Sequence, residues 1–337
     1  MKERQREGEA NPYVLIDIER AREVIGHALA ARKAKRLIFS KELLPPEAAF
    51  METIKEEGEK IGNPDFALNA CFLMSVVIFA DNSYRQLNRL ANKEFFDKYG
   101  WILDPNKIKN ATENEFLDAA RTYTGAGYNA GALPGWRDNA LLLVSKYEGK
   151  VRKFFASHNF EYSQILQNLV GPKNKKDWGG FRRFGPKISR LFLQWVSQYD
   201  LAELRGTGQS GIPVDFQLTR LMVQTGAVKL TGPTHKHWVQ DRGLVEMIPK
   251  IISVFSEKPA YISETLWLIG SHCCNNYDHQ ACPLANDCNL LISRVPLDRD
   301  GLIDPEDKGR NFSRNPKKDL EKRKKQEEAG QKTLLLF

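Results

Sequence analysis

The stretch WGGFRRFGPK, residues 178–187, leads directly into an apolar helix pattern that begins at Ile188. Gly185 permits a tight turn, and the first amides of the following helix are suited to bind an anion. Arg182 and Arg183 add positive charge beside that turn. Taken alone, the stretch fits either a phosphate-binding turn or a basic surface loop in front of a core helix.

Two residues with reactive side chains stand at the starts of separate helix patterns. Lys187 closes the basic turn, and Asp215 closes the stretch IPVD, residues 212–215, before another apolar pattern. A neutral amine is a nucleophile toward carbon, and a carboxylate stabilises positive charge that develops near it. The amine, the carboxylate and the turn together suggest excision of a base from DNA.

The composition suits an intracellular protein with a polyanionic partner. The chain has 337 residues, a net charge of +8 and an apolar content of 42%. No apolar run approaches the roughly 20 residues that a membrane span needs. Residues 1–10 are charged and lack the apolar core of a secretion signal. We therefore expect a cytoplasmic (nucleoid) or nuclear protein that binds no membrane and acts as a monomer.

Apolar spacing predicts an almost wholly helical chain without alternating strand patterns. The expected helices cover 17–39, 66–80, 113–123, 136–147, 163–170, 188–199, 216–225, 244–256 and 263–270. Glycines predict a loop over 125–135, and Trp136, Trp178, Phe181 and Trp195 are expected in the core. After Leu291 the dense charge predicts a disordered basic tail.

In combination, these segments resemble the helix-hairpin-helix (HhH-GPD) DNA glycosylase superfamily, which includes endonuclease III and the adenine-mismatch and 8-oxoguanine glycosylases. That family carries the pattern LPGVGxK and, later, a Val-Asp pair at a helix start. Lys187 falls on the family's Schiff-base lysine, and Asp215 falls on its catalytic aspartate. The similarity covers roughly residues 66–291, including GYN at 127–129.

The resemblance implies an all-α, two-lobed fold with a cysteine-rich loop of the iron–sulfur type. The expected organisation is a helical segment packing on the second lobe (1–65), a lobe with the hairpin (66–200), an inserted loop (201–214) with a flexible stretch over 204–211, a second helical lobe with the cysteines (215–295) and a tail (296–337). The insertion lengthens the spacing between Lys187 and Asp215 beyond that of the family.

The resemblance also implies which residues contact double-stranded DNA. Arg182, Arg183 and Gly185 belong to the hairpin, and Arg183 replaces its first glycine, so we expect a distorted hairpin. Asp81 and Asn82 fall on the loop that fills the gap left by an extruded base. Gln217, where relatives often have His or Asn, completes the expected set.

The implied reaction starts with extrusion of a damaged or mismatched base into a pocket. Asp215 would stabilise the charge developing on the sugar, and Lys187 would attack C1′ as a neutral amine. Schiff-base formation then permits strand cleavage by an abasic-site lyase. The alternatives are a monofunctional glycosylase acting on adenine mispairs, uracil or alkylated bases, and a non-catalytic damage-binding scaffold.

Four of the five cysteines gather between residues 273 and 288. Cys282 and Cys288 have the spacing of the last two ligands of the family's [4Fe–4S] cluster, Cys-x6-Cys-x2-Cys-x5-Cys. His279 occupies the second ligand position, and Cys273 and Cys274 stand near the first. Either both adjacent cysteines ligate, or one does together with His279; zinc and a metal-free site are the alternatives.

The C-terminal residues 331–337 have the form QxxLxLF, which resembles sliding-clamp recognition peptides. Gln331 would set the orientation, and Leu334 and Phe337 would fill apolar pockets at the end of a flexible tether. A chance match is the alternative.

Overall fold

The computed structural model describes residues 14–41, 43–45, 47–77, 87, 91–124, 132–171, 180–207, 212–230, 247–248, 250–274, 278 and 280–288. The chain divides into two compact units. We call Leu44–Pro213 the central unit, and Met1–Leu43 together with Val214–Phe337 the split unit. The described residues are mostly helical, as expected, and none of their helices combines the length and apolar character required to cross a bilayer.

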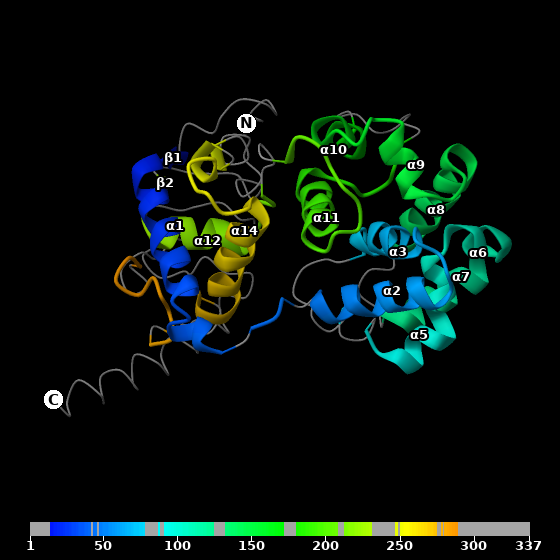
Figure 1. Ribbon diagram of the computed structural model, residues 1–337, viewed down its shortest axis with the longest axis horizontal. Helices are drawn as coiled ribbons and strands as arrows, with labels where there is room; N and C mark the ends of the chain where they lie inside the picture. Colours follow the sequence, from blue (N-terminus) through cyan, green and yellow to red (C-terminus); the bar gives the residue numbers. More distant parts are fainter. Residues whose placement is uncertain are drawn as a thin grey trace, which may run out of the picture. The chain divides into compact units, whose positions relative to one another are not determined.

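The central unit is built around one helix that is buried on every side. This helix, α3 (Phe66–Ser75), contacts α2, α8, α9 and α11, and α2 lies beside it in Figure 1. The elements of the unit are α2 (Ala48–Lys60), α3, α5 (Lys93–Tyr99), the 3-10 helix η3 (Gly100–Leu103), α6 (Pro105–Asn110), α7 (Glu113–Thr124), α8 (Leu133–Tyr147), α9 (Val151–Ala156), α10 (Tyr162–Val170) and α11 (Pro186–Gln198).

Local chemistry fixes where several of these helices begin. Thr112 and Glu115 form a reciprocal capping box before α7, with the Glu115 carboxylate accepting from the Thr112 amide at 2.8 Å. The Asp104 carboxylate caps α6, and proline occupies the first turn of α6, α8 and α11, where its missing amide costs nothing.

The split unit joins the two ends of the described chain. Its elements are β1 (Val14–Ile16), α1 (Ile18–Lys33), the 3-10 helix η1 (Leu37–Ser40), α12 (Phe216–Gln224), β2 (Val228–Leu230), α14 (Pro259–Leu268) and the π-helix η6 (Ile269–Cys274). β1 and β2 pair antiparallel, with Leu15 opposite Lys229. Arg32 links α1 to α14 by donating to Thr265 Oγ1 at 2.8 Å and stacking over the Tyr261 ring.

The expected N-terminal segment 1–65 is divided by the structure. Its first part belongs to the split unit, but α2 belongs to the central unit because Phe50, Met51 and Ile54 are buried in the core that contains α3. The prediction that residues 44–65 pack on the second lobe is therefore wrong. A helix's own periodicity reveals its apolar face but not its partner.

Three further expectations need correction. The chain contains the β1–β2 pair, whose strands of three residues are too short to show alternation. The expected helix over 17–39 ends at Lys33, because Lys35 and Leu37 adopt left-handed backbone conformations with φ of 50° and 56°. Leu133 and Pro134 already belong to α8, so the loop before it is shorter than expected.

The inserted loop 201–214 is anchored in its first half rather than flexible. The Arg205 amide donates to the Phe160 carbonyl at 2.8 Å, and the Arg205 carbonyl accepts from the Tyr162 amide at 3.0 Å. Leu201 and Ala202 are buried in the central core. Residues 208–211 and the tail 296–337 lie outside the described residues.

Candidate functional site

The helix start at Lys187 is open to an anion. Gly185 is the N-cap of α11, Pro186 and Lys187 are its first residues, and no side chain of the described residues caps it. The unsatisfied amides of a helix's first turn and its dipole favour negative charge. Lys187 is half-buried, and the Arg190 guanidinium bonds to the Pro186 carbonyl at 3.2 Å. Burial lowers the pKa of Arg190, although its high ordinary pKa keeps it charged.

Buried aromatic rings anchor residues 181–184, the segment before α11, to the core. Phe181 and Phe184 are buried, and their ring centroids lie 4.8 and 4.7 Å from that of Phe72 in α3. This confirms Phe181 as core, as it does Trp136 and Trp195. Trp178 lies outside the described residues. Because the two phenylalanines point inward, Arg182 and Arg183 between them are exposed.

A buried side-chain amide forms hydrogen bonds with the backbone of the same segment. Asn139 of α8 is fully buried, accepts from the Arg182 amide through Oδ1 at 2.6 Å and donates through Nδ2 to the Arg182 carbonyl at 3.1 Å. This pairing satisfies both backbone groups of one residue, which fixes the peptide planes on either side of it. The sequence offers no sign of the role, because residues 139 and 182 lie on separate elements.

The tight turn depends on Arg183 instead of Gly185. Arg183 adopts the left-handed conformation with φ of +64°, whereas Gly185 is extended with φ −91° and ψ 176°. A Cβ placed on Gly185 would meet nothing within 4 Å, so this glycine is not required for the turn. The expectation for Gly185 is thus corrected: Arg183, not Gly185, has the backbone conformation that favours glycine.

Asp215 is the N-cap of α12. Its Oδ1 accepts from the Leu218 amide at 2.9 Å, and its carbonyl accepts from the Thr219 hydroxyl at 2.7 Å. The preceding Ile212 and Val214 are buried, which fixes the entry of the chain into the helix. Asp215 belongs to the split unit and Lys187 to the central unit.

Gln217 connects α12 to the π-helix. Its Oε1 accepts from the guanidinium of buried Arg220 at 2.6 Å, and the same Arg220 nitrogen donates to the Gly270 carbonyl at 2.7 Å. A Cβ on Gly270 would approach Gln217 Cβ to 3.0 Å, so the close contact requires glycine. These contacts give Gln217 a structural role, and its contact with DNA stays a prediction.

The π-helix η6 ends with two adjacent buried cysteines, Cys273 and Cys274. Cys273, Cys274 and Cys282 are buried, Cys288 is half-buried, and none of these four described residues forms a disulfide. The Cys273 thiol donates to the Cys282 sulfur, which raises the pKa of Cys273 and lowers that of Cys282. Burial raises the pKa of Cys274 to about 11, an effect that the Arg220 guanidinium opposes.

The four cysteine sulfurs are not arranged as three ligands around one ion. No three of the four cysteine sulfurs lie within 4.8 Å of one another. Around one zinc ion, with Zn–S bonds of about 2.3 Å, all thiolates would lie about 4 Å apart. The Cys282 sulfur also accepts a hydrogen bond from the Leu284 amide, as expected for a sulfur that carries negative charge when it ligates a metal.

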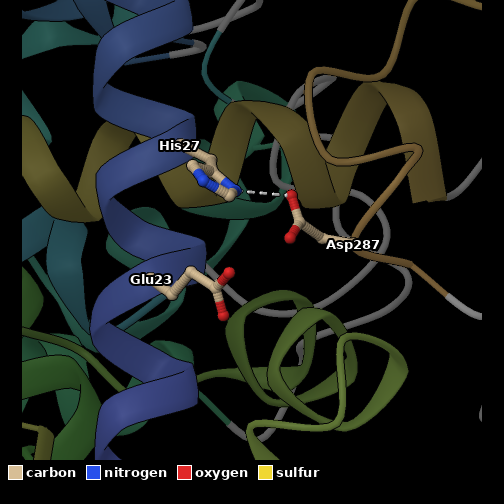
Figure 2. A group of neighbouring side chains, drawn as sticks. All are labelled: Glu23, His27 and Asp287. Atoms are coloured by element: carbon tan, nitrogen blue, oxygen red, sulfur yellow. Dashed lines mark hydrogen bonds and ion pairs between the residues drawn. The ribbon is translucent and has the colours of Figure 1, made fainter.

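A charged network that the sequence did not suggest lies beside the cysteine loop, which we define as residues 278–288. Figure 2 shows Glu23 and His27 on α1 facing Asp287, with potential ligand atoms within 4.8 Å of one another. Arg20, however, bonds to Glu23 at 2.6 Å and to Asp287 at 3.1 Å. Because Arg20 already neutralises both carboxylates, we interpret the group as an ion network and not as a cation site.

Six of the expected site residues lie outside the described part of the chain. They are Asp81, Asn82, His279, Gln331, Leu334 and Phe337. Their proposed roles therefore stay predictions from the sequence.

No model of a protein family matches the chain, and no curated protein matches its sequence.

Proposed function

We propose that the chain is a DNA glycosylase of the helix-hairpin-helix type, which removes a damaged or mismatched base and cleaves the strand at the resulting site. The observation that carries this proposal is the anchored backbone of residues 181–184. Phe181, Phe184 and Asn139 fix this backbone, Arg182 and Arg183 are exposed, and Lys187 lies on the uncapped first turn of α11. Exposed guanidinium groups beside open helix amides are suited to bind a DNA phosphate.

The reaction that we propose uses Lys187 as the nucleophile. Its neutral amine forms a bond to C1′ of the extruded nucleotide as the bond from C1′ to the base breaks and the base leaves with a proton. In the resulting N,O-acetal the bond from C1′ to the ring oxygen O4′ breaks, O4′ takes up a proton, and a protonated Schiff base forms between Lys187 and C1′. Loss of a proton from C2′ then expels the 3′ phosphate by β-elimination, which cleaves the strand.

We propose that Asp215 stabilises the positive charge that develops on the sugar. Its cap bond to Leu218 holds the carboxylate in one orientation before the substrate arrives. Asp215 Oδ2 has no hydrogen bond among the described residues and is the oxygen that we assign to the sugar.

We propose that Cys273, Cys274, Cys282 and Cys288 bind a [4Fe–4S] cluster, with His279 in place of one adjacent cysteine as the alternative set. Four thiols between residues 273 and 288, three of them buried, match the softness of iron–sulfur and zinc centres. The bound cluster would supply structural support to the loop rather than chemistry on the base. The protein's own residues hold the sulfurs in place, as Leu284 does for Cys282.

The experiment that tests the function is a cleavage assay on duplexes that carry a panel of damaged and mismatched bases. Wild-type protein is expected to release at least one base, and Lys187→Gln and Asp215→Asn are expected to abolish strand cleavage. Lys60→Gln is the matched control, because Lys60 is an exposed lysine of α2 paired with Glu57. Base release without strand cleavage by the wild type would indicate a monofunctional enzyme. Binding to lesion duplexes without any release would indicate a damage-binding scaffold.

A further inference from the structure

We propose that helix α1 retains the metal centre, and that Arg20 is the positioning residue through which it does so. The inference rests on the metal centre proposed above. It concerns residues far from the cysteines in sequence, since Arg20 and Cys288 stand near opposite ends of the described chain.

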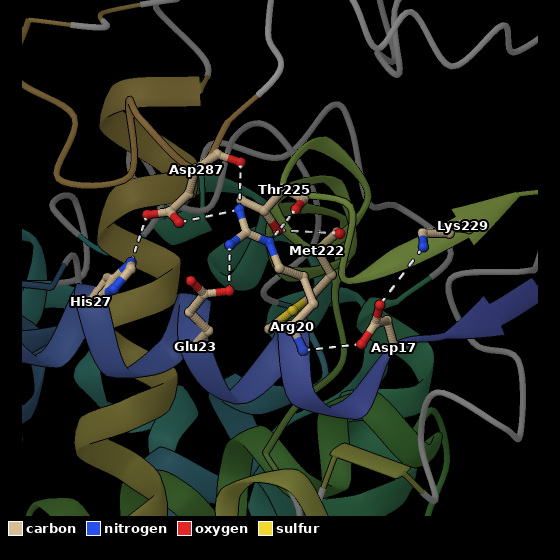
Figure 3. Close-up of polar contacts among 8 residues, drawn as sticks. All are labelled: Asp17, Arg20, Glu23, His27, Met222, Thr225, Lys229 and Asp287. Carbon is tan, nitrogen blue, oxygen red and sulfur yellow. Dashed lines mark hydrogen bonds and ion pairs between the residues drawn. The ribbon is translucent and has the colours of Figure 1, made fainter.

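Arg20 joins three elements through one guanidinium group (Figure 3). Its Nε donates to the Thr225 carbonyl at the end of α12 at 3.0 Å, and one terminal nitrogen donates to Glu23 of α1 at 2.6 Å. The other terminal nitrogen lies 3.0 Å from the Asp287 carbonyl and 3.1 Å from its carboxylate Oδ1. Arg20 therefore contacts the backbone and the side chain of the residue directly before Cys288.

His27 provides a second partner on α1 for the Asp287 carboxylate. Its Nδ1 lies 2.9 Å from Asp287 Oδ2, so the two carboxylate oxygens have one partner each from the same helix. The Asp287 side chain is only 10% exposed, so a lost partner would not be replaced fully by water. Charge-assisted bonds of this kind are stronger than neutral ones.

A backbone contact fixes the other end of the cysteine loop. The Ile38 amide, just beyond α1, donates to the Ala281 carbonyl at 3.0 Å, next to Cys282. Within the loop, the Ala285 amide bonds to the Cys282 carbonyl at 3.2 Å, and the Asp287 amide bonds to the Leu284 carbonyl at 3.0 Å. Contacts from the α1 region thus lie one residue before each of two proposed ligands, Cys282 and Cys288.

The physical consequence concerns how easily a ligand leaves the metal. Consecutive Cα atoms are about 3.8 Å apart, so Cys288 cannot keep its place when the backbone of Asp287 moves away. Removal of the Arg20 guanidinium breaks the bond to the Asp287 carbonyl and leaves its carboxylate with one partner fewer. We therefore expect the metal to be lost faster without any change in the ligands themselves.

The test compares full-length wild-type protein with Arg20→Ala, Arg20→Lys and Arg22→Ala, each purified with its metal. Arg22 is the matched control, because it lies on the same helix and pairs with Glu19 at 2.7 Å. The measurements are iron per chain, the rate of absorbance loss on addition of a strong iron chelator, and hydrogen exchange of residues 280–288.

We expect Arg20→Ala to lose metal at least about tenfold faster than the wild type, with faster exchange in the cysteine loop. Arg20→Lys keeps the positive charge but not the several donors of the guanidinium group, so its rate of metal loss should lie between those of the wild type and Arg20→Ala. Arg22→Ala should lose metal at the wild-type rate. Metal loss from Arg20→Ala at the wild-type rate would overturn the proposal. So would equal acceleration by Arg22→Ala, because that would indicate a general effect of weakening α1.

Two additional arms keep the test decisive. If Arg20→Ala does not fold, His27→Ala removes only the bond to Oδ2 and should accelerate metal loss about twofold to fivefold; an unchanged rate would then contradict the proposal. If the wild type holds no metal, the proposed centre fails. Hydrogen exchange of residues 280–288 in the metal-free protein then tests whether Arg20 fixes the cysteine loop. Equal protection in wild type and Arg20→Ala would overturn the proposal.

Discussion

The side chain of Asn139 forms hydrogen bonds with both the amide and the carbonyl of Arg182, at 2.6 and 3.1 Å. A fully buried amide of α8 thereby fixes the backbone of an exposed arginine. The segment before α11 is thus anchored twice: the rings of Phe181 and Phe184 pack against Phe72, and Asn139 bonds to the Arg182 backbone. Preorganised phosphate donors lose little conformational entropy when they bind.

Replacement of Asn139 should weaken both the fold and DNA binding. Asn139→Ala leaves two backbone groups of Arg182 without their partner, and we expect the free energy of unfolding to fall by about 2–4 kcal/mol. Urea denaturation measures this change. Asn168→Ala, which removes an exposed asparagine whose side chain bonds to the Gln164 carbonyl, should change it by less than about 0.5 kcal/mol. Equal losses in the two variants would contradict the proposed role of Asn139.

Replacement of Arg183 by glycine should separate stability from DNA affinity. A glycine adopts the φ of +64° without the strain of a side chain, so Arg183→Gly should raise the free energy of unfolding by up to about 1 kcal/mol. The lost guanidinium should weaken DNA binding and reduce the slope of log affinity against log salt by about one. Arg182→Gly, at a residue outside the left-handed region, should weaken DNA binding similarly but lower the stability. Fluorescence anisotropy across a salt series and urea denaturation measure the two effects. A higher free energy of unfolding for Arg182→Gly than for Arg183→Gly would contradict the claim that the Arg183 backbone is strained.

Two substitutions of Asp215 should distinguish its capping role from its proposed catalytic role. Asparagine caps helices about as well as aspartate, so Asp215→Asn should change the free energy of unfolding by less than about 0.5 kcal/mol. Asp215→Ala removes the bond to the Leu218 amide and should cost about 1 kcal/mol. Both variants should lose base release, as measured on the best lesion duplex, because neither carries a carboxylate. If Asp215→Asn is stable and releases the base as fast as the wild type, Asp215 acts only as the helix cap.

The C-terminal peptide is expected to bind a sliding clamp without affecting catalysis. Deletion of residues 331–337 should abolish binding to the clamp of the same organism and leave base release on naked DNA unchanged. Surface plasmon resonance with immobilised clamp measures the first effect. Substitution of Lys324 and Lys325 by glutamine is the control, since it keeps the apolar end of the chain. Unaltered clamp affinity after the deletion would show that the match is coincidental.

Local chemistry explains what could be predicted from the sequence. The starts of α11 and α12 follow from residues within a few positions, Gly185-Pro186 in one case and Asp215 in the other. The left-handed backbone of Arg183 could not be predicted, because buried rings on both sides of it impose that conformation. The contact of Arg20 with Asp287 was equally hidden, since 267 residues separate the two. The same limit misplaced α2, whose apolar face does not reveal that α3 covers it.

Chemical trapping of the Schiff base tests the central claim most directly. Wild-type protein mixed with a panel of lesion-containing duplexes and sodium borohydride should give a covalent protein–DNA complex on at least one lesion. Peptide mapping should locate the cross-link at Lys187, and Lys187→Gln should form no complex. A wild-type protein that releases a base yet forms no covalent complex, or a complex that persists in Lys187→Gln, would contradict the assignment of Lys187 as the nucleophile.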